Sequence, residues 1–153
     1  MTLTEVLENF TFLNDEQTEK IKNAGFVDGS VDNFSVVEYF IKKGDLESVT
    51  TCIENGIDVN SSEQGDFGSS LLHIAIRFGK MEVFLYLIEK GANLDFVDKV
   101  GWTPLMESVV DDKAEFGKIL VEKGCNKGLI NMRGASAQAL AQKFGRQDFF
   151  SFL

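Results

Sequence analysis

The chain has 153 residues, with 24 acidic and 15 basic side chains, a formal net charge of −9 and 44% hydrophobic residues. These values suit one globular domain with an ordinary core. The acidity argues against a nucleic-acid partner, because phosphate binding depends on Lys and Arg. No apolar run reaches the roughly 20 residues of a membrane helix, and the first residues lack the basic and apolar parts of a secretory signal. We therefore expect a cytoplasmic protein that binds neither nucleic acid nor membrane.

Residues 1–33 are expected to form a helical capping segment ahead of the repeats described below. Asn14 and Gln17 stand at the two positions of a capping box, which predicts a second short helix ending at Gly25. The first helix is indicated by apolar residues at helical spacing. These residues are Leu3, Val6, Leu7 and Phe10.

The acidity is concentrated toward the N-terminus, since residues 1–66 hold 14 acidic and 4 basic side chains, whereas residues 67–153 hold 10 and 11. One interpretation is a pair of helices that covers the open end of a repeat stack. The alternative is an acidic arm that binds a basic partner. We favour the first, because the end of a stack needs cover. The acids concerned are Glu5, Glu8, Asp15, Glu16 and Glu19.

A repeated pattern begins at Ser35 and starts again, at nearly constant spacing, at Ser70, Thr103 and Ser136. A Ser or Thr can cap a helix, and glycine closes helices in the left-handed conformation. A turn residue stands nine positions after each start, and a second glycine follows in the first three units. The pattern therefore predicts that each unit folds as a helix, a tight turn and a second helix. The turn residues are Gly44, Gly79, Asp112 and Gly145, and the later glycines are Gly56, Gly91 and Gly124.

The segments "SLLHIA" at 70–75 and "TPLMES" at 103–108 resemble the T-P-L-H-x-A signature of the ankyrin repeat. The resemblance implies an all-α ankyrin-repeat solenoid of stacked helix-turn-helix units, with a degenerate first repeat. The nine-residue link "SSEQGDFGS" is longer by two residues than the next link, which predicts an enlarged turn. The expected units form one domain and span residues 34–64, 65–97, 98–130 and 131–153.

The last unit reaches Leu153 about seven residues into its expected second helix. Its phenylalanines are expected to cover the preceding repeat, with one or more left exposed. They are Phe149, Phe150 and Phe152.

The only histidine, His73, occupies the histidine position of the signature. The resemblance implies that it makes a hydrogen bond tying the start of its helix to the neighbouring turn. The alternative, a general base, lacks a nucleophile or carboxylate at triad spacing. Cys52 and Cys125 lack any familiar zinc spacing and are interpreted as buried packing residues.

Three carboxylates, Glu107, Asp111 and Glu115, recur every four residues and would share the face of a continuous helix. The turn expected at Asp111 and Asp112 separates them instead, and no calcium-binding loop surrounds them. No glycine-rich phosphate loop is present either. We expect no enzymatic activity, no cofactor and no metal.

With catalytic, metal and phosphate sites not supported, the remaining candidate is a protein-binding surface. The resemblance implies that the loop before each first helix and the exposed side of that helix form a concave face used for protein partners. Large apolar and basic residues occupy these positions, and aromatic residues and Arg are enriched at binding hot spots. We call the following set the predicted face: Phe67, Ser69, Arg77, Phe78, Lys99, Val100, Trp102, Val110, Asp111, Met132, Arg133 and Phe144.

The function expected from this surface is non-catalytic binding of another protein, by occlusion or as an adaptor, as an inhibitor or immunity-like protein would act. The alternative is a structural or self-associating protein that uses the apolar C-terminal end or the same face. A monomer is favoured over a homo-oligomer, and the identity of the partner does not follow from the sequence.

Overall fold

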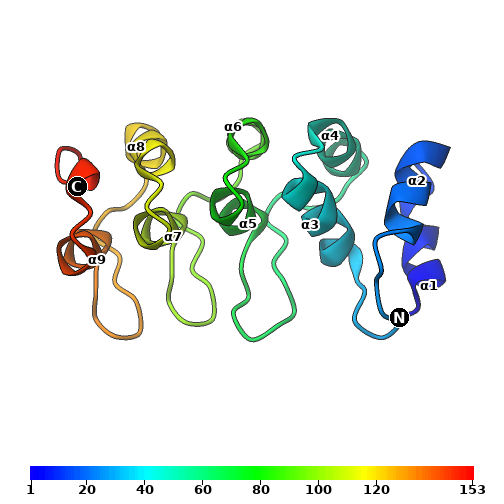
Figure 1. The fold of residues 1–153 in the computed structure, drawn as a ribbon, viewed down its shortest axis with the longest axis horizontal. Coiled ribbons are helices and arrows are strands. Elements are labelled where there is room, and N and C mark those ends of the chain that lie inside the picture. Colours follow the sequence, from blue (N-terminus) through cyan, green and yellow to red (C-terminus); the bar gives the residue numbers. More distant parts are fainter.

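The computed structural model describes residues 1–153 and shows helix pairs stacked in one row (Figure 1). The elements are α1 (Leu3–Leu7), η1 (Glu8–Phe10), α2 (Asp15–Lys22), α3 (Asn33–Lys43), α4 (Leu46–Glu54), α5 (Leu71–Arg77), α6 (Met81–Glu89), α7 (Pro104–Val110), α8 (Ala114–Glu122), α9 (Ala137–Phe144) and η2 (Gln147–Phe149), where η marks a 3₁₀ turn.

The first helices of the pairs, α3, α5, α7 and α9, lie in one layer, and α4, α6 and α8 lie in a second (Figure 1). Long loops project from the first layer on the side away from the second. The buried apolar residues form one continuous cluster along the row. The all-α solenoid expected from the repeat pattern is confirmed. No helix is both long and apolar enough to cross a bilayer.

The starts of three first helices follow the expected caps. The side chains of Ser70, Thr103 and Ser136 each accept a hydrogen bond from the backbone N–H three residues later. The expectation for Ser35 is wrong, because Asp32 caps α3 and accepts from the Ser35 N–H at 2.8 Å. The Asp32 carboxylate lies three residues before Ser35 and accepts a hydrogen bond from a backbone N–H of the first turn, as a Ser or Thr cap would. As a result α3 has 11 residues, whereas α5 and α7 have 7.

The tight turns between the paired helices adopt the left-handed conformation that the pattern predicts. Gly44, Gly79 and Gly145 have φ of 70°, 65° and 65°, and Asp112 has φ of 56°. Asp112 is the only non-glycine residue at positive φ, a region that Asp tolerates better than most residues do. Its carboxylate also lies 3.1 Å from Arg146. The repeat therefore keeps its turn without the glycine.

The expected second helix of the last unit is replaced by the single turn η2. Phe149 is fully buried, and its ring lies where a side chain at Gly117 would be, in α8. Arg146 donates hydrogen bonds to the carbonyls of Val109 and Val110. Contacts with the preceding repeat thus determine this turn, and Phe150 stays 50% exposed.

The N-terminal segment contains the two expected helical stretches. The capping box of Asn14 and Gln17 is present, and α2 ends at Lys22, three residues before the expected glycine. The Gln17 amide donates to the Ser48 hydroxyl at 3.1 Å, and Lys20 lies 3.1 Å from Asp45. These contacts place α2 against the start of α4.

Candidate protein-binding site

Closed loops precede the first helices. The loop before α5 is closed by a hydrogen bond from the Glu63 N–H to the Ser69 carbonyl at 3.0 Å, and the loop before α7 by one from Asp98 to Trp102 at 2.9 Å. The first loop therefore encloses two more residues than the second, which confirms the enlarged turn. Phe67 lies in this enlarged loop and is 60% exposed.

Trp102 is fixed at the base of its loop by backbone hydrogen bonds. Its N–H donates to Asp98 Oδ1 at 2.8 Å, and its carbonyl accepts from His73 Nε2 at 3.3 Å. The other ring nitrogen of His73 accepts from the Ser70 N–H at 3.3 Å. His73 is fully buried, and burial lowers its pKa to about 4, so the imidazole is neutral at pH 7. The tie from helix start to neighbouring turn, implied for His73 by the resemblance, is confirmed.

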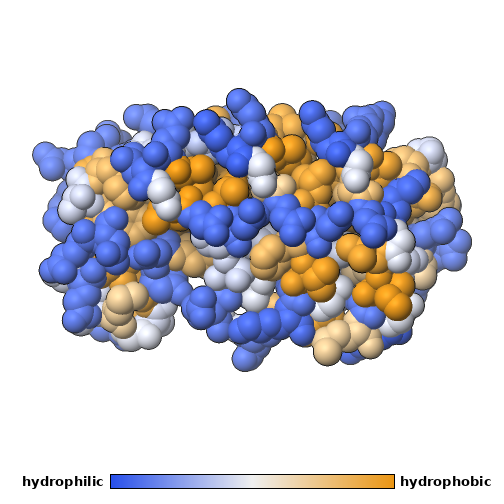
Figure 2. Space-filling view, turned by 180° about the vertical axis from the view of Figure 1, so that it is seen from behind, coloured by the Kyte–Doolittle hydropathy of each residue, from blue (hydrophilic) through white to orange (hydrophobic).

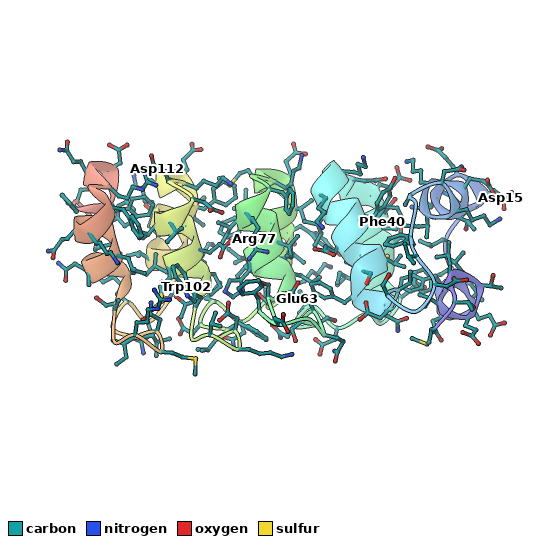
Figure 3. The ribbon with its side chains drawn as sticks, turned by 60° about the horizontal axis from the view of Figure 1, so that its bottom comes forward. Asp15, Phe40, Glu63, Arg77, Trp102 and Asp112 are labelled. Atoms are coloured by element: carbon teal, nitrogen blue, oxygen red, sulfur yellow. The ribbon has the colours of Figure 1, made fainter.

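Arg77 on α5 reaches across to the next repeat (Figure 3). Its Nε lies 2.7 Å from Glu107 Oε1 on α7, and its Nη2 donates to the Ser69 hydroxyl at 3.1 Å. Burial raises the pKa of Glu107, although the hydrogen bond from Arg77 opposes this shift. Burial opposes the charge of Arg77 too, but the hydrogen bond to Glu107 and the surrounding carboxylate charges together outweigh it and raise the pKa of Arg77.

These groups surround a pocket of about 400 Å³, which we call the central pocket. It lies between the loops and the first helices of two successive repeats, and Trp102 and Arg77 come from opposite sides of it (Figure 3). Half of its lining residues are apolar. The lining consists of Phe67, Arg77, Asp98, Val100, Trp102, Glu107, Val110 and Asp111.

The structure brings six residues of the predicted face into this pocket, namely Phe67, Arg77, Val100, Trp102, Val110 and Asp111. Lys99 is exposed and donates to the Gly65 carbonyl at 2.7 Å, linking two adjacent loops. Met132 is 77% exposed, and Arg133 beside it is exposed as well. Phe78 and Phe144 are 42% and 44% exposed at the far ends of α5 and α9 from the loops.

The view from behind shows how the exposed apolar residues are distributed (Figure 2). Apolar patches lie between charged and polar atoms, and those along the lower, loop-bearing part lie mainly toward the C-terminal end. Val97 and Ile130, outside the predicted face, are 51% and 62% exposed in loops there. Residues at the bases of these loops thus expose apolar side chains in addition to those around the pocket.

Three expectations about the face need correction. Ser69 is fully buried beneath Arg77, so it supports the surface and cannot contact a partner. The ring of Trp102 packs partly against the core, whereas the repeat register leaves that position free. Arg77, expected among the basic residues of the face, is paired with Glu107. The centre of the face is accordingly less basic than predicted.

Sequence reasoning missed two lining residues, Asp98 and Glu107. The sequence contains a pattern that could have identified each of them. Asp98 and Asn131 begin the similar loops "DKVGWT" and "NMRGAS" of successive repeats, and the side chains of both accept backbone N–H groups of their loops. Glu107 lies three and four residues before Val110 and Asp111, so all three share a helix face.

The two thiols are buried away from this surface. Burial raises the pKa of Cys52 to about 12 and that of Cys125 to about 11, so both are protonated near neutral pH. No group of three or more His, Cys, Asp or Glu side chains is placed to hold a metal ion. Neither cysteine has the depressed pKa of a reactive thiol.

Comparison with known families identifies the repeat. Residues 37–131 match the family model described as ankyrin repeats in three copies. The chain belongs to the ankyrin-repeat family. Ankyrin repeats mediate binding to other proteins, and the helix pairs, left-handed turns and projecting loops described above are the corresponding parts of this chain.

Several characterised proteins are similar to this ankyrin-repeat chain. The probable 26S proteasome regulatory subunit p28 of Saccharomyces cerevisiae is 31% identical over 100 residues, 64% of this chain and 43% of the yeast protein. The human protein phosphatase 1 regulatory subunit 27 is 30% identical over 94 residues, which is 61% of this chain and 60% of the human protein. The mouse protein phosphatase 1 regulatory subunit 12A is 34% identical over 76 residues, which is 50% of this chain and 7% of the mouse protein. The chain thus spans less than two thirds of each relative.

Proposed function

We propose that this chain is a non-catalytic protein-binding module that acts by occlusion or as an adaptor, through the exposed members of the predicted face. Two lines of support are independent of the pocket. Ankyrin repeats mediate protein binding, and the relatives compared above carry names of regulatory subunits. The partner is another protein, and binding, rather than chemistry on it, is the activity.

The observation that carries the proposal is the combination of exposed apolar side chains with a rigid pocket between them. Phe67 is 60% exposed and Met132 is 77% exposed. Hydration of such apolar surfaces is unfavourable until a partner covers them. Trp102 lies between their loops with its backbone held by Asp98 and His73. A preorganised aromatic anchor loses little conformational entropy on binding.

The test compares capture of the native partner by immobilised wild type, Phe67→Ala and Leu85→Ala. Leu85 on α6 is 44% exposed and lies in the other helix layer, so it is a matched control for loss of exposed apolar area. We expect Phe67→Ala to weaken capture by on the order of 2 kcal/mol and Leu85→Ala to leave it unchanged. Circular dichroism should show the same helix content in all three.

Equal capture by Phe67→Ala and the wild type, or loss of capture only in Leu85→Ala, would contradict the proposal. Trp102→Ala serves as a second variant. Because its ring packs partly against the core, its thermal stability must be measured alongside capture. Weak capture by a folded Trp102→Ala protein supports the proposed face, whereas an unfolded one assigns Trp102 to the core.

A further inference from the structure

The charges that line the central pocket are unbalanced. It is lined by three carboxylates, Asp98, Glu107 and Asp111, and by one cation, Arg77. Both hydrogen bonds of the Arg77 guanidinium are made within the fold, to Glu107 and Ser69. The only cation of the lining is therefore already paired with Glu107, and an incoming anion would also be repelled by Asp98 and Asp111.

The carboxylates retain acceptor capacity. Asp98 accepts the Val100 and Trp102 N–H groups with Oδ1 alone, at 3.0 and 2.8 Å. Glu107 accepts from Arg77 with Oε1 alone. Asp111 accepts no hydrogen bond: its Oδ2 is buried without a partner, and the nearest ammonium, Lys113 Nζ, lies 3.9 Å away.

Lys113 forms only a long ion pair with Asp111, at 3.9 Å, and the hydrogen bond of its ammonium goes to the Arg77 carbonyl. Leaving a buried acceptor unpaired is unfavourable. A donor brought into the pocket would recover part of that cost. The unused acceptor capacity of Asp111 and the free oxygens of the other two carboxylates all favour a positively charged donor.

The apolar part of the lining suits the stem of the same kind of side chain. Phe67 and Trp102 supply aromatic surface, and Val100 and Val110 supply aliphatic surface. Lys and Arg bury their methylene stems along such surfaces and interact with aromatic faces. The pocket volume of about 400 Å³ lies at the small end of the range for ligand pockets and has room for one such side chain.

We infer that the central pocket receives a lysine or arginine side chain of the protein partner. The stem lies against Phe67 and Trp102, and the cationic group lies among Asp98, Glu107 and Asp111. This inference rests on the proposed function and specifies it: the partner presents a basic anchor residue. An apolar or an acidic anchor is the competing outcome in the test below.

The test uses the indole N–H of Trp102 as a reporter, because Trp102 is the only tryptophan and gives one unambiguous NMR signal. The full chain is titrated with the N-acetyl methylamides of arginine, lysine, norleucine and glutamate. We expect a saturable shift of the indole signal with the arginine or lysine probe, and at least about fivefold weaker binding of norleucine and glutamate. Equal or tighter binding of norleucine or glutamate, or no saturation with either cation, would overturn the inference.

Two variants, each of which removes one carboxylate charge, show whether the cationic probe binds in this pocket. Asp111→Asn should weaken binding of the cationic probe about fivefold, because one carboxylate of the pocket is lost. Asp112→Asn is the matched control, since it removes the same charge one residue away. Asp112 does not line the pocket, and its carboxylate pairs with Arg146 instead. Asparagine also tolerates its positive φ.

Unchanged cation binding in Asp111→Asn, or an equal loss in Asp112→Asn, would overturn the assignment of the charge to this pocket. The probe titration needs no native partner, so its outcome is separate from the capture experiment. Cation binding with unaltered capture by Phe67→Ala would refute the proposed function. Capture lost in Phe67→Ala without cation preference would refute only the inference about the anchor.

Discussion

His73 is a residue type that can act as a general base, but its burial gives it a structural role in this fold. Its two ring nitrogens join the start of α5 to the loop that carries Trp102, and its pKa falls from 6.5 to about 4 in the fold. The unfolded chain therefore binds a proton more readily than the folded chain does. The stability contributed by neutral His73 is complete above pH 6.5 and is lost as the pH falls toward 4.

We predict that the free energy of unfolding of the wild type falls by about 3 kcal/mol more than that of His73→Gln between pH 7 and pH 4. Glutamine at this position can still reach back to the Ser70 N–H as in a capping box, but it does not titrate. Urea unfolding at several pH values measures the difference, and the carboxylates common to both proteins cancel. Parallel pH profiles would show that His73 does not carry a depressed pKa.

Contacts between residues far apart in the sequence were harder to predict than contacts between neighbours. The caps at Ser70, Thr103 and Ser136 are local, three residues from their donors, and the pattern predicted them. The pair of Arg77 and Glu107 joins residues 30 apart in sequence, and no local rule indicates it. Burial of Ser69 follows from that pair, so it was missed for the same reason.

The elements differ most from the ideal repeat at the two ends of the stack. α3 is longer than α5 and α7 because Asp32 captures its first turn, and the last unit ends in a 3₁₀ turn. The repeat pattern predicted the inner helices and turns because their caps and glycines recur at fixed spacing. The ends depend on what covers them, which periodicity does not specify.

Gly117 on α8 tests the packing of the final turn. A Cβ at this position would lie 2.7 Å from the Phe149 ring and 2.8 Å from the Ser108 hydroxyl. On an exposed helix, replacing glycine with alanine stabilises by about 1 kcal/mol. Here we predict that Gly117→Ala destabilises by about 1–3 kcal/mol, because the core has no space for the methyl group.

Thermal unfolding followed by circular dichroism measures this effect. Gly65→Ala is the control, since its Cβ would meet only the end of the Glu63 side chain, at 3.9 Å. A stabilised Gly117→Ala protein would mean that Phe149 does not cover α8 as described.

The whole molecule is a row of repeats that carries most of its exposed large apolar residues on loops and at helix ends. At the C-terminal end Phe149 is fully buried and Phe152 partly buried, so Phe150 alone among the three is exposed. This small area is well below what a stable homodimer buries. We predict a monomer of 17.0 kDa at micromolar concentration.

Light scattering across a dilution series checks that prediction. A mass that rises with concentration in the wild type, and stays constant in Phe150→Ser, would assign the end of the stack to self-association. That result would favour the structural alternative over the binding module.

The central claim is that a protein partner binds the face made by the loops and the first helices. Hydrogen exchange of the chain, free and bound to its captured partner, tests this most directly. We predict slower exchange in the loops at residues 63–69, 97–102 and 130–135, with little change in α4, α6 and α8. Slowed exchange confined to α4, α6 and α8, with the loops unchanged, would contradict it.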